Sequence, residues 1–190
     1  MDDKDETSLY PPEADLNIYY LCVGRVAMGW AAFETRLNHT IWRLAGVEQY
    51  AGACLTAQIM APIARFRALV ALAQFRGATK ERCKALNALS SKADAVARQR
   101  NRMVHDPAYI KDDEMFRLQV TADRVIDFEM KSVDLKDFAK LEVDISKLTQ
   151  EFIKQASEMF AELPQYDDTS FQQSEGIEIG PLPTPDTAQL

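Results

Sequence analysis

The residues best suited to chemistry lie in one short stretch, RQRNRMVHDPAYI, which begins at Arg98 and contains one of the chain's two histidines. It places Arg98, Arg100, Arg102 and His105 within eight residues. Histidine suits proton transfer because imidazole titrates near neutral pH, and arginine suits phosphate because its planar guanidinium offers a fork of donors. The stretch is therefore either a solvated helix end or a catalytic cluster directed at an anion.

The sequence before this stretch predicts a long helix that carries it. Thr79 precedes the segment KERCKALNALSSKADAVARQRNRMVH, in which apolar residues recur at steps of three and four. Pro107 disfavours helical geometry at Asp106, so the helix should end near His105. The candidate residues are thus expected on its last two turns.

Helical projection separates Arg100 from its charged neighbours. At about 100° per residue, one polar stripe is formed by Asp94, Arg98, Asn101 and His105. Arg100 instead takes a position on the apolar seam, where a guanidinium must be paired because it is never neutral. We predict two partners for it, which do not exclude each other: a carboxylate such as Glu34 of the first helix, or an anion at a contact between subunits.

The other residues of the stretch have alternative interpretations. His105 is either an acid–base group or a cation that complements the C-terminal end of the helix dipole. We assign Arg98, Arg102 and Tyr109 to substrate binding, although Tyr109 could equally pack against the helices and Arg98 could belong to a solvated helix end.

Together these residue types suit the cleavage of RNA without a metal. That reaction needs a group to take the proton of the ribose 2′-OH or to protonate the leaving 5′-oxygen, which is a task for His105. It also needs a cation to stabilise the charge on the phosphorane, which Arg100 could supply. Asn101 could orient the substrate or the imidazole.

The elements that must position these residues are mostly helical. A first helix is predicted from just after Pro11-Pro12 to about Ala45, and further helices are predicted within 49–76. The segment MFRLQVTADRVIDFEMKSV alternates and predicts a β-hairpin with its turn near Asp123. A last long helix follows over 134–163. The fold class is all-α: a bundle of four to five helices with a small β-hairpin before the last long helix.

Charge divides the chain into three parts. The net charge is −7, but residues 1–15 hold six acids against one lysine, and residues 164–190 hold five acids and no base. We expect residues 1–13 and 164–190 to be disordered acidic tails around a helical domain at 14–163. Within that domain, 65–105 holds ten Lys and Arg against two acids, so one part of an acidic protein could still attract RNA.

Composition excludes several other classes of site. The longest uncharged run, 49–64, is too short and too interrupted to cross a bilayer, and the acidic N-terminus does not resemble a signal peptide, so we expect a cytoplasmic protein without a membrane partner. Three dispersed cysteines and two histidines make a disulfide framework or a zinc site implausible. We expect neither a metal nor a cofactor.

At this point the sequence resembles a known family, that of the HEPN domains. RNRMVH, from Arg100 to His105, is similar to the family's motif of an arginine and a histidine separated by four to six residues, with a polar residue after the arginine. The stretch WAAFETRL, from Trp30 to Leu37, and the order of the helices fit as well, so the resemblance spans roughly residues 14–163.

The resemblance implies a helical homodimer in which two motif helices form a cleft lined by arginine and histidine from both chains. Many family members are metal-independent endoribonucleases of toxin–antitoxin or phage-defence systems that leave 2′,3′-cyclic phosphate ends. By position, Arg100 would contact the scissile phosphate, His105 would be the acid–base group and Asn101 the positioning residue. A cognate antitoxin or another neighbouring-gene product is a possible partner. The alternatives are a non-catalytic HEPN-like binding module and a structural dimer whose seam arginine forms an interface salt bridge.

Overall fold

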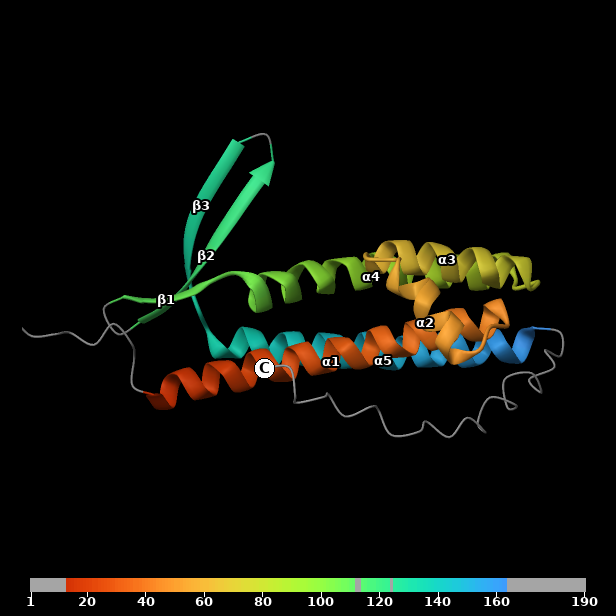
Figure 1. Ribbon diagram of the computed structural model, residues 1–190, viewed down its shortest axis with the longest axis horizontal. Coiled ribbons are helices and arrows are strands. Elements are labelled where there is room, and N and C mark those ends of the chain that lie inside the picture. The colour runs from red at the N-terminus through yellow and green to blue at the C-terminus, as the bar shows by residue number, and fades with distance from the viewer. Residues whose placement is uncertain (1–12, 112–113, 124, 164–190) are drawn as a thin grey trace, which may run out of the picture.

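The described part of the chain forms five helices, four of which are long and lie side by side. The computed structural model describes residues 13–111, 114–123 and 125–163. Helices α1 and α5 run along one side of the bundle, and α3 and α4 lie against them (Figure 1). The helices span Glu13–Ala45 (α1), Gln49–Ala57 (α2), Pro62–Phe75 (α3), Lys80–His105 (α4) and Leu135–Glu162 (α5). The chain is therefore mostly helical, as the apolar periodicity predicts.

Local sequence signals set the helix ends. Thr79 accepts a hydrogen bond at its Oγ1 from the backbone N–H of Arg82 (3.2 Å), and Asp134 caps α5 by accepting one from the N–H of Lys136 (2.8 Å). Gly77 follows α3 with a φ of 95°, a conformation that favours glycine. Helix α4 ends at His105, two residues before Pro107, as predicted.

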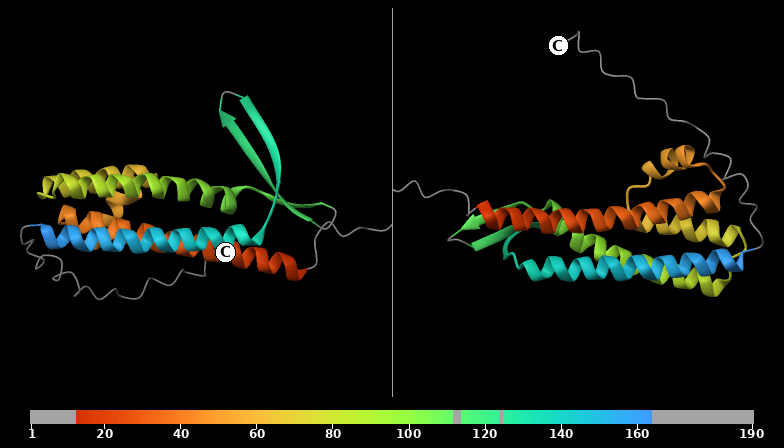
Figure 2. Two further views of the ribbon diagram at one scale, coloured as in Figure 1. Left: turned by 180° about the vertical axis from the view of Figure 1, so that it is seen from behind. Right: turned by 90° about the horizontal axis from the view of Figure 1, so that it is seen from below.

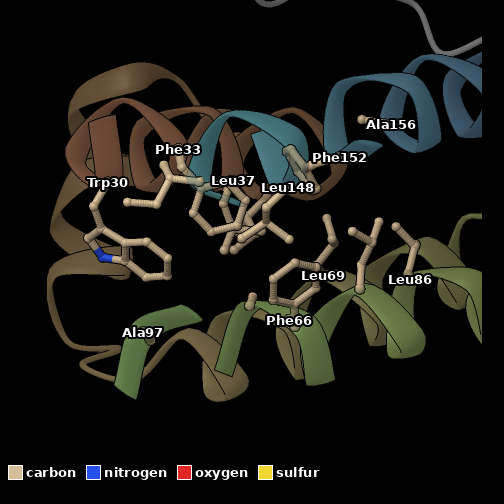
Figure 3. Close-up of a cluster of buried hydrophobic side chains, with 14 of the residues drawn as sticks. Trp30, Phe33, Leu37, Phe66, Leu69, Leu86, Ala97, Leu148, Phe152 and Ala156 are labelled. Carbon is tan, nitrogen blue, oxygen red and sulfur yellow. The ribbon is translucent and has the colours of Figure 1, made fainter. Parts of the chain in front are cut away.

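Aromatic rings from three helices meet at the centre of the core. Phe33 of α1 lies with its ring centroid 5.8 Å from that of Phe152 of α5, and Phe66 of α3 completes the group at 6.0 Å from Phe152. All three side chains are buried, and burying a phenylalanine stabilises a fold by roughly 1.5–3 kcal/mol. Trp30 and Ala97 lie together at one end of this cluster (Figure 3), beside the last turns of α4.

A small antiparallel sheet is inserted between α4 and α5. Its strands are β1 (Ala108–Lys111), β2 (Glu114–Asp123) and β3 (Val125–Ser132), in the spatial order β1-β2-β3. The predicted hairpin is confirmed as β2 and β3. The sequence prediction missed β1, because its four residues are too few to show an alternating pattern and they become a strand only by pairing with β2.

The β2–β3 hairpin projects from the end of the bundle (Figures 1 and 2). Its polar face is turned toward the helices and its apolar face away from them. Gln119 and Lys131 belong to the polar face, which lines a pocket with α4 and α5. The opposite face is apolar: Val120 pairs with Phe128, and Val120, Ile126, Phe128 and Met130 are 42%, 65%, 65% and 48% exposed. An amphipathic sheet normally turns its apolar face toward its own core. This hairpin turns it to solvent.

The predicted disordered tails, 1–13 and 164–190, lie outside the described residues, except for Glu13, which is the first residue of α1. None of the helices in the described part of the chain has an apolar run long enough to cross a bilayer.

Candidate functional site

The end of α4 brings Arg100, Asn101 and His105 together within a single chain. Arg100 donates a hydrogen bond from Nη1 to the Oδ1 of Asn101 (2.7 Å), and the same Nη1 lies 3.3 Å from the Nε2 of His105. Helical projection predicted that Arg100 lies apart from Asn101 and His105. For the guanidinium this prediction is wrong, because it contacts both residues. The arginine side chain is long enough to leave the seam and carry its guanidinium onto the polar stripe.

The contact between Arg100 and His105 involves the Nε2 of the imidazole. A guanidinium has donors only, so a hydrogen bond from Arg100 requires a lone pair on the Nε2 of His105. His105 is the exposed last residue of α4, so this nitrogen lies at the surface beside a cation.

The ring of Trp30 provides a favourable contact for the charge of Arg100 on the apolar seam. The Cζ of Arg100 lies 5.6 Å from the centre of the buried Trp30 ring, within the range of a cation–π interaction. Its Nε is buried without a hydrogen-bond partner in the described part of the chain. Sequence reasoning missed this role of Trp30, because an aromatic residue on a helix seam signals only that it is buried.

The predicted ion pair between Arg100 and Glu34 does not form. Glu34 accepts a hydrogen bond at Oε1 from the Nη1 of Arg65 at 2.8 Å. Arg65, which also donates from Nε to the carbonyl oxygen of Ile59 (2.9 Å), is delivered by α3, which packs on α1. Among the described residues, no carboxylate forms an ion pair with Arg100. Its charge is left available to an external anion.

The predicted substrate-binding arginines have partners of their own. Arg98 forms an ion pair with Asp94, one turn earlier on α4. Arg102 donates from Nη1 to the carbonyl oxygen of Val120 (2.9 Å), and that nitrogen lies 3.9 Å from a carboxylate oxygen of Asp106. Arg102 therefore joins α4 to β2. The sequence assigned Arg102 to substrate binding. Its contact with β2 could not be predicted, because Val120 comes close to Arg102 only after the hairpin has packed beside α4.

Tyr109 lies on β1, opposite Phe116 of β2, and its side chain is 46% exposed. It is part of the sheet that follows α4, so its place relative to His105 is set by strand pairing and not by helix geometry. The half-exposed ring keeps one side accessible beyond the end of α4.

The cluster can bind an anion and exchange a proton. In the described part of the chain, Arg100 supplies a cation without a carboxylate partner, His105 an exposed imidazole, and Asn101 an amide that accepts a hydrogen bond from the arginine. No three histidine, cysteine or acidic side chains within residues 13–111, 114–123 and 125–163 lie close enough to hold a metal ion. The chemistry of this donor set is that of a phosphate or another oxyanion.

Comparison of the chain with protein-family models, with curated proteins and with solved structures finds no match. The assignment of a function therefore rests on the residues and the geometry of the cluster at the end of α4.

Proposed function

We propose that this protein is a metal-independent endoribonuclease of the HEPN type, which acts on RNA in the cytoplasm as a toxin or a phage-defence factor does. One observation carries the proposal. The guanidinium of Arg100 touches both Asn101 and His105 at the exposed end of α4. Structural arginines at partly buried positions are normally held by a carboxylate, as Arg65 is by Glu34.

The mechanism follows from what each side chain can do. When RNA binds, the guanidinium of Arg100 turns from the Nε2 of His105 to the phosphate, and the freed Nε2 accepts the proton of the ribose 2′-OH. The 2′-oxygen then attacks the adjacent phosphorus. Arg100 stabilises the negative charge on the phosphorane, and Asn101 positions the guanidinium. The bond from phosphorus to the 5′-oxygen breaks, and that oxygen takes a proton, which leaves a 2′,3′-cyclic phosphate and a free 5′-hydroxyl.

The reaction uses a proton acceptor and a proton donor, so we place it between two copies of the chain. Each copy supplies one imidazole from the end of α4. The outward apolar face of the hairpin supports this arrangement, because in a monomer it leaves an apolar patch on the order of a few hundred Å² in water. A twofold dimer covers identical patches with each other.

The two histidines of the chain provide a matched test of catalysis. Purified protein is incubated with RNA in the presence of EDTA, as wild type, as His105→Ala and as His39→Ala. His39 is an exposed residue of α1 whose ring lies 4.7 Å from that of Trp42. We expect cleavage by the wild type and by His39→Ala and a loss of at least about 100-fold in His105→Ala. Intact RNA with all three proteins refutes the proposal.

The dimer is tested by the molar mass of the protein in solution. The double substitution Ile126→Ser and Phe128→Ser removes the two most exposed large side chains of the apolar face, and we expect the mass to fall from that of a dimer to that of a monomer. Serine at Asp127, which lies between them on the opposite face, is the control and should leave the dimer intact. A wild-type monomer that still cleaves RNA contradicts the composite cleft.

The apolar face of the hairpin also favours a second candidate function, a non-catalytic HEPN-like helical module. An outward apolar face suits a protein partner whether or not α4 carries out chemistry, and that partner could be an antitoxin or another neighbouring-gene product. This function predicts a stable complex through the hairpin and no RNA cleavage. The same pair of serine substitutions would then abolish the complex, and His105→Ala would have no effect.

A further inference from the structure

The polar face of the hairpin lines a second cationic site on the other side of α4. A pocket of about 300 Å³ lies between the base of the hairpin, the end of α4 and the start of α5. Four of its lining residues are cations, namely Arg102, Arg117, Lys131 and Lys140, and one, Asp137, is an acid. This local charge of +3 contrasts with the net charge of −7 of the chain.

Two of the four cations have no carboxylate partner among the described residues. Lys131 forms an ion pair with Glu129 (3.2 Å), and Arg102 is held by β2. Arg117 and Lys140, in contrast, form no ion pair with any acid in the described part of the chain. The Nη1 of Arg117 is, moreover, buried without an acceptor from any residue that the structure describes. A charged donor without a hydrogen bond lowers the stability of the fold unless a ligand or solvent molecule compensates for the missing bond.

The positive charge of Arg117 affects a residue of the core, Tyr19. Burial raises the pKa of Tyr19 above its ordinary value, and the positive charge of Arg117 acts against that rise. Tyr19 is 6% exposed and belongs to the core. The fold buries the Nη1 of Arg117, and the same residue lines the pocket. A fixed cation of this kind is suited to a phosphate, because its donors are already oriented.

We propose that this pocket binds a backbone phosphate of the RNA strand next to the phosphate that is cleaved. The proposal rests on the proposed function and adds the path of the substrate. Arg102 lines the pocket and directly follows Asn101 of the catalytic cluster, so the two sites lie on different faces of the same helical turn. Their separation is about the diameter of a helix with its side chains, roughly 10 Å. A short single strand that passes around the end of α4 reaches both.

Binding of RNA that cannot be cleaved tests the pocket apart from catalysis. A short, fluorescent 2′-O-methyl RNA is titrated in several salt concentrations with Arg117→Gln, with Lys140→Gln and with Lys147→Gln. Lys147 is an exposed lysine of α5 outside the pocket and serves as the matched control. Lys140 is also exposed, so its substitution leaves the fold intact. Each lost phosphate contact should lower the slope of log K against log salt by about 0.7.

We expect the pocket variants to bind RNA more weakly and with a smaller salt slope than the control. A slope and an affinity equal to those of Lys147→Gln overturn the proposal, and cleavage that still depends on His105 would then leave the proposed function standing. If none of the proteins binds RNA, both fail. A thermal stabilisation by inorganic phosphate that needs Lys140, with unchanged RNA binding, would assign the pocket to free phosphate and also overturn the proposal.

Discussion

Replacing Arg100 by methionine separates a catalytic arginine from a structural one. Methionine retains an unbranched side chain that can lie on Trp30, and it removes the charge. The substitution loses the cation–π contact, worth about 0.5–2 kcal/mol, and the exposed hydrogen bonds to Asn101 and His105, worth about 0.5–1 kcal/mol each. It also removes a buried Nε that has no acceptor, a defect that costs about 1–3 kcal/mol.

These opposing terms nearly cancel. We expect the free energy of unfolding of Arg100→Met to lie within about 1 kcal/mol of the wild-type value, which for a chain of this size shifts the melting temperature by no more than about 4 °C. The cleavage rate should fall by about 100- to 1000-fold, the usual loss when one group that stabilises a phosphorane or oxyanion is removed. Activity and stability would thus respond very differently to the same change.

Thermal unfolding and RNA cleavage in EDTA, measured on the same samples, check this expectation. Arg100→Lys is the companion variant, because it keeps a charge and loses the planar fork, and we expect intermediate activity. A destabilisation of Arg100→Met by more than about 3 kcal/mol would refute the reasoning, since it would mean that the arginine is a structural member of the seam. An unchanged cleavage rate would refute it equally.

Two further predictions concern the bundle. A Cβ at Gly52 would clash with the ring of Trp42, so Gly52→Ala should lower the free energy of unfolding by about 1–3 kcal/mol. A Cβ at Gly24 would meet no described atom within 4 Å, so Gly24→Ala should raise the free energy of unfolding by about 0.5–1 kcal/mol. Chemical denaturation measures both changes. Hydrogen bonds from Arg82 lower the pKa of Glu162 below its ordinary value of 4.5, so their contribution is present above that pH and disappears as the pH falls through the lowered pKa. The difference in stability between the wild type and Arg82→Met should therefore shrink under acid conditions, and a difference that is constant with pH would contradict this.

The helices could be predicted because their signals are local. Thr79 and Asp134 cap α4 and α5 with side-chain oxygens that accept from nearby backbone N–H groups, and Pro107 ends α4 because it disfavours helical geometry at the residue before it. The composition of the cluster at the end of α4 was also predictable, since Arg100, Asn101 and His105 lie within two turns of one helix. Its internal contacts were not, because a helical projection follows Cβ directions and ignores the reach of a long side chain.

The sequence by itself determined which helices form, where α4 stops and which residues gather at that end, because capping, proline geometry and apolar periodicity act between neighbours in the chain. Only the tertiary structure decided which partners the charges take. Glu34 pairs with Arg65 because α3 packs on α1, and Arg100 rests on Trp30 because α1 passes beside the end of α4. These pairings depend on which helix surfaces meet after the helices have formed, and the spacing of residues along the chain does not determine which surfaces meet.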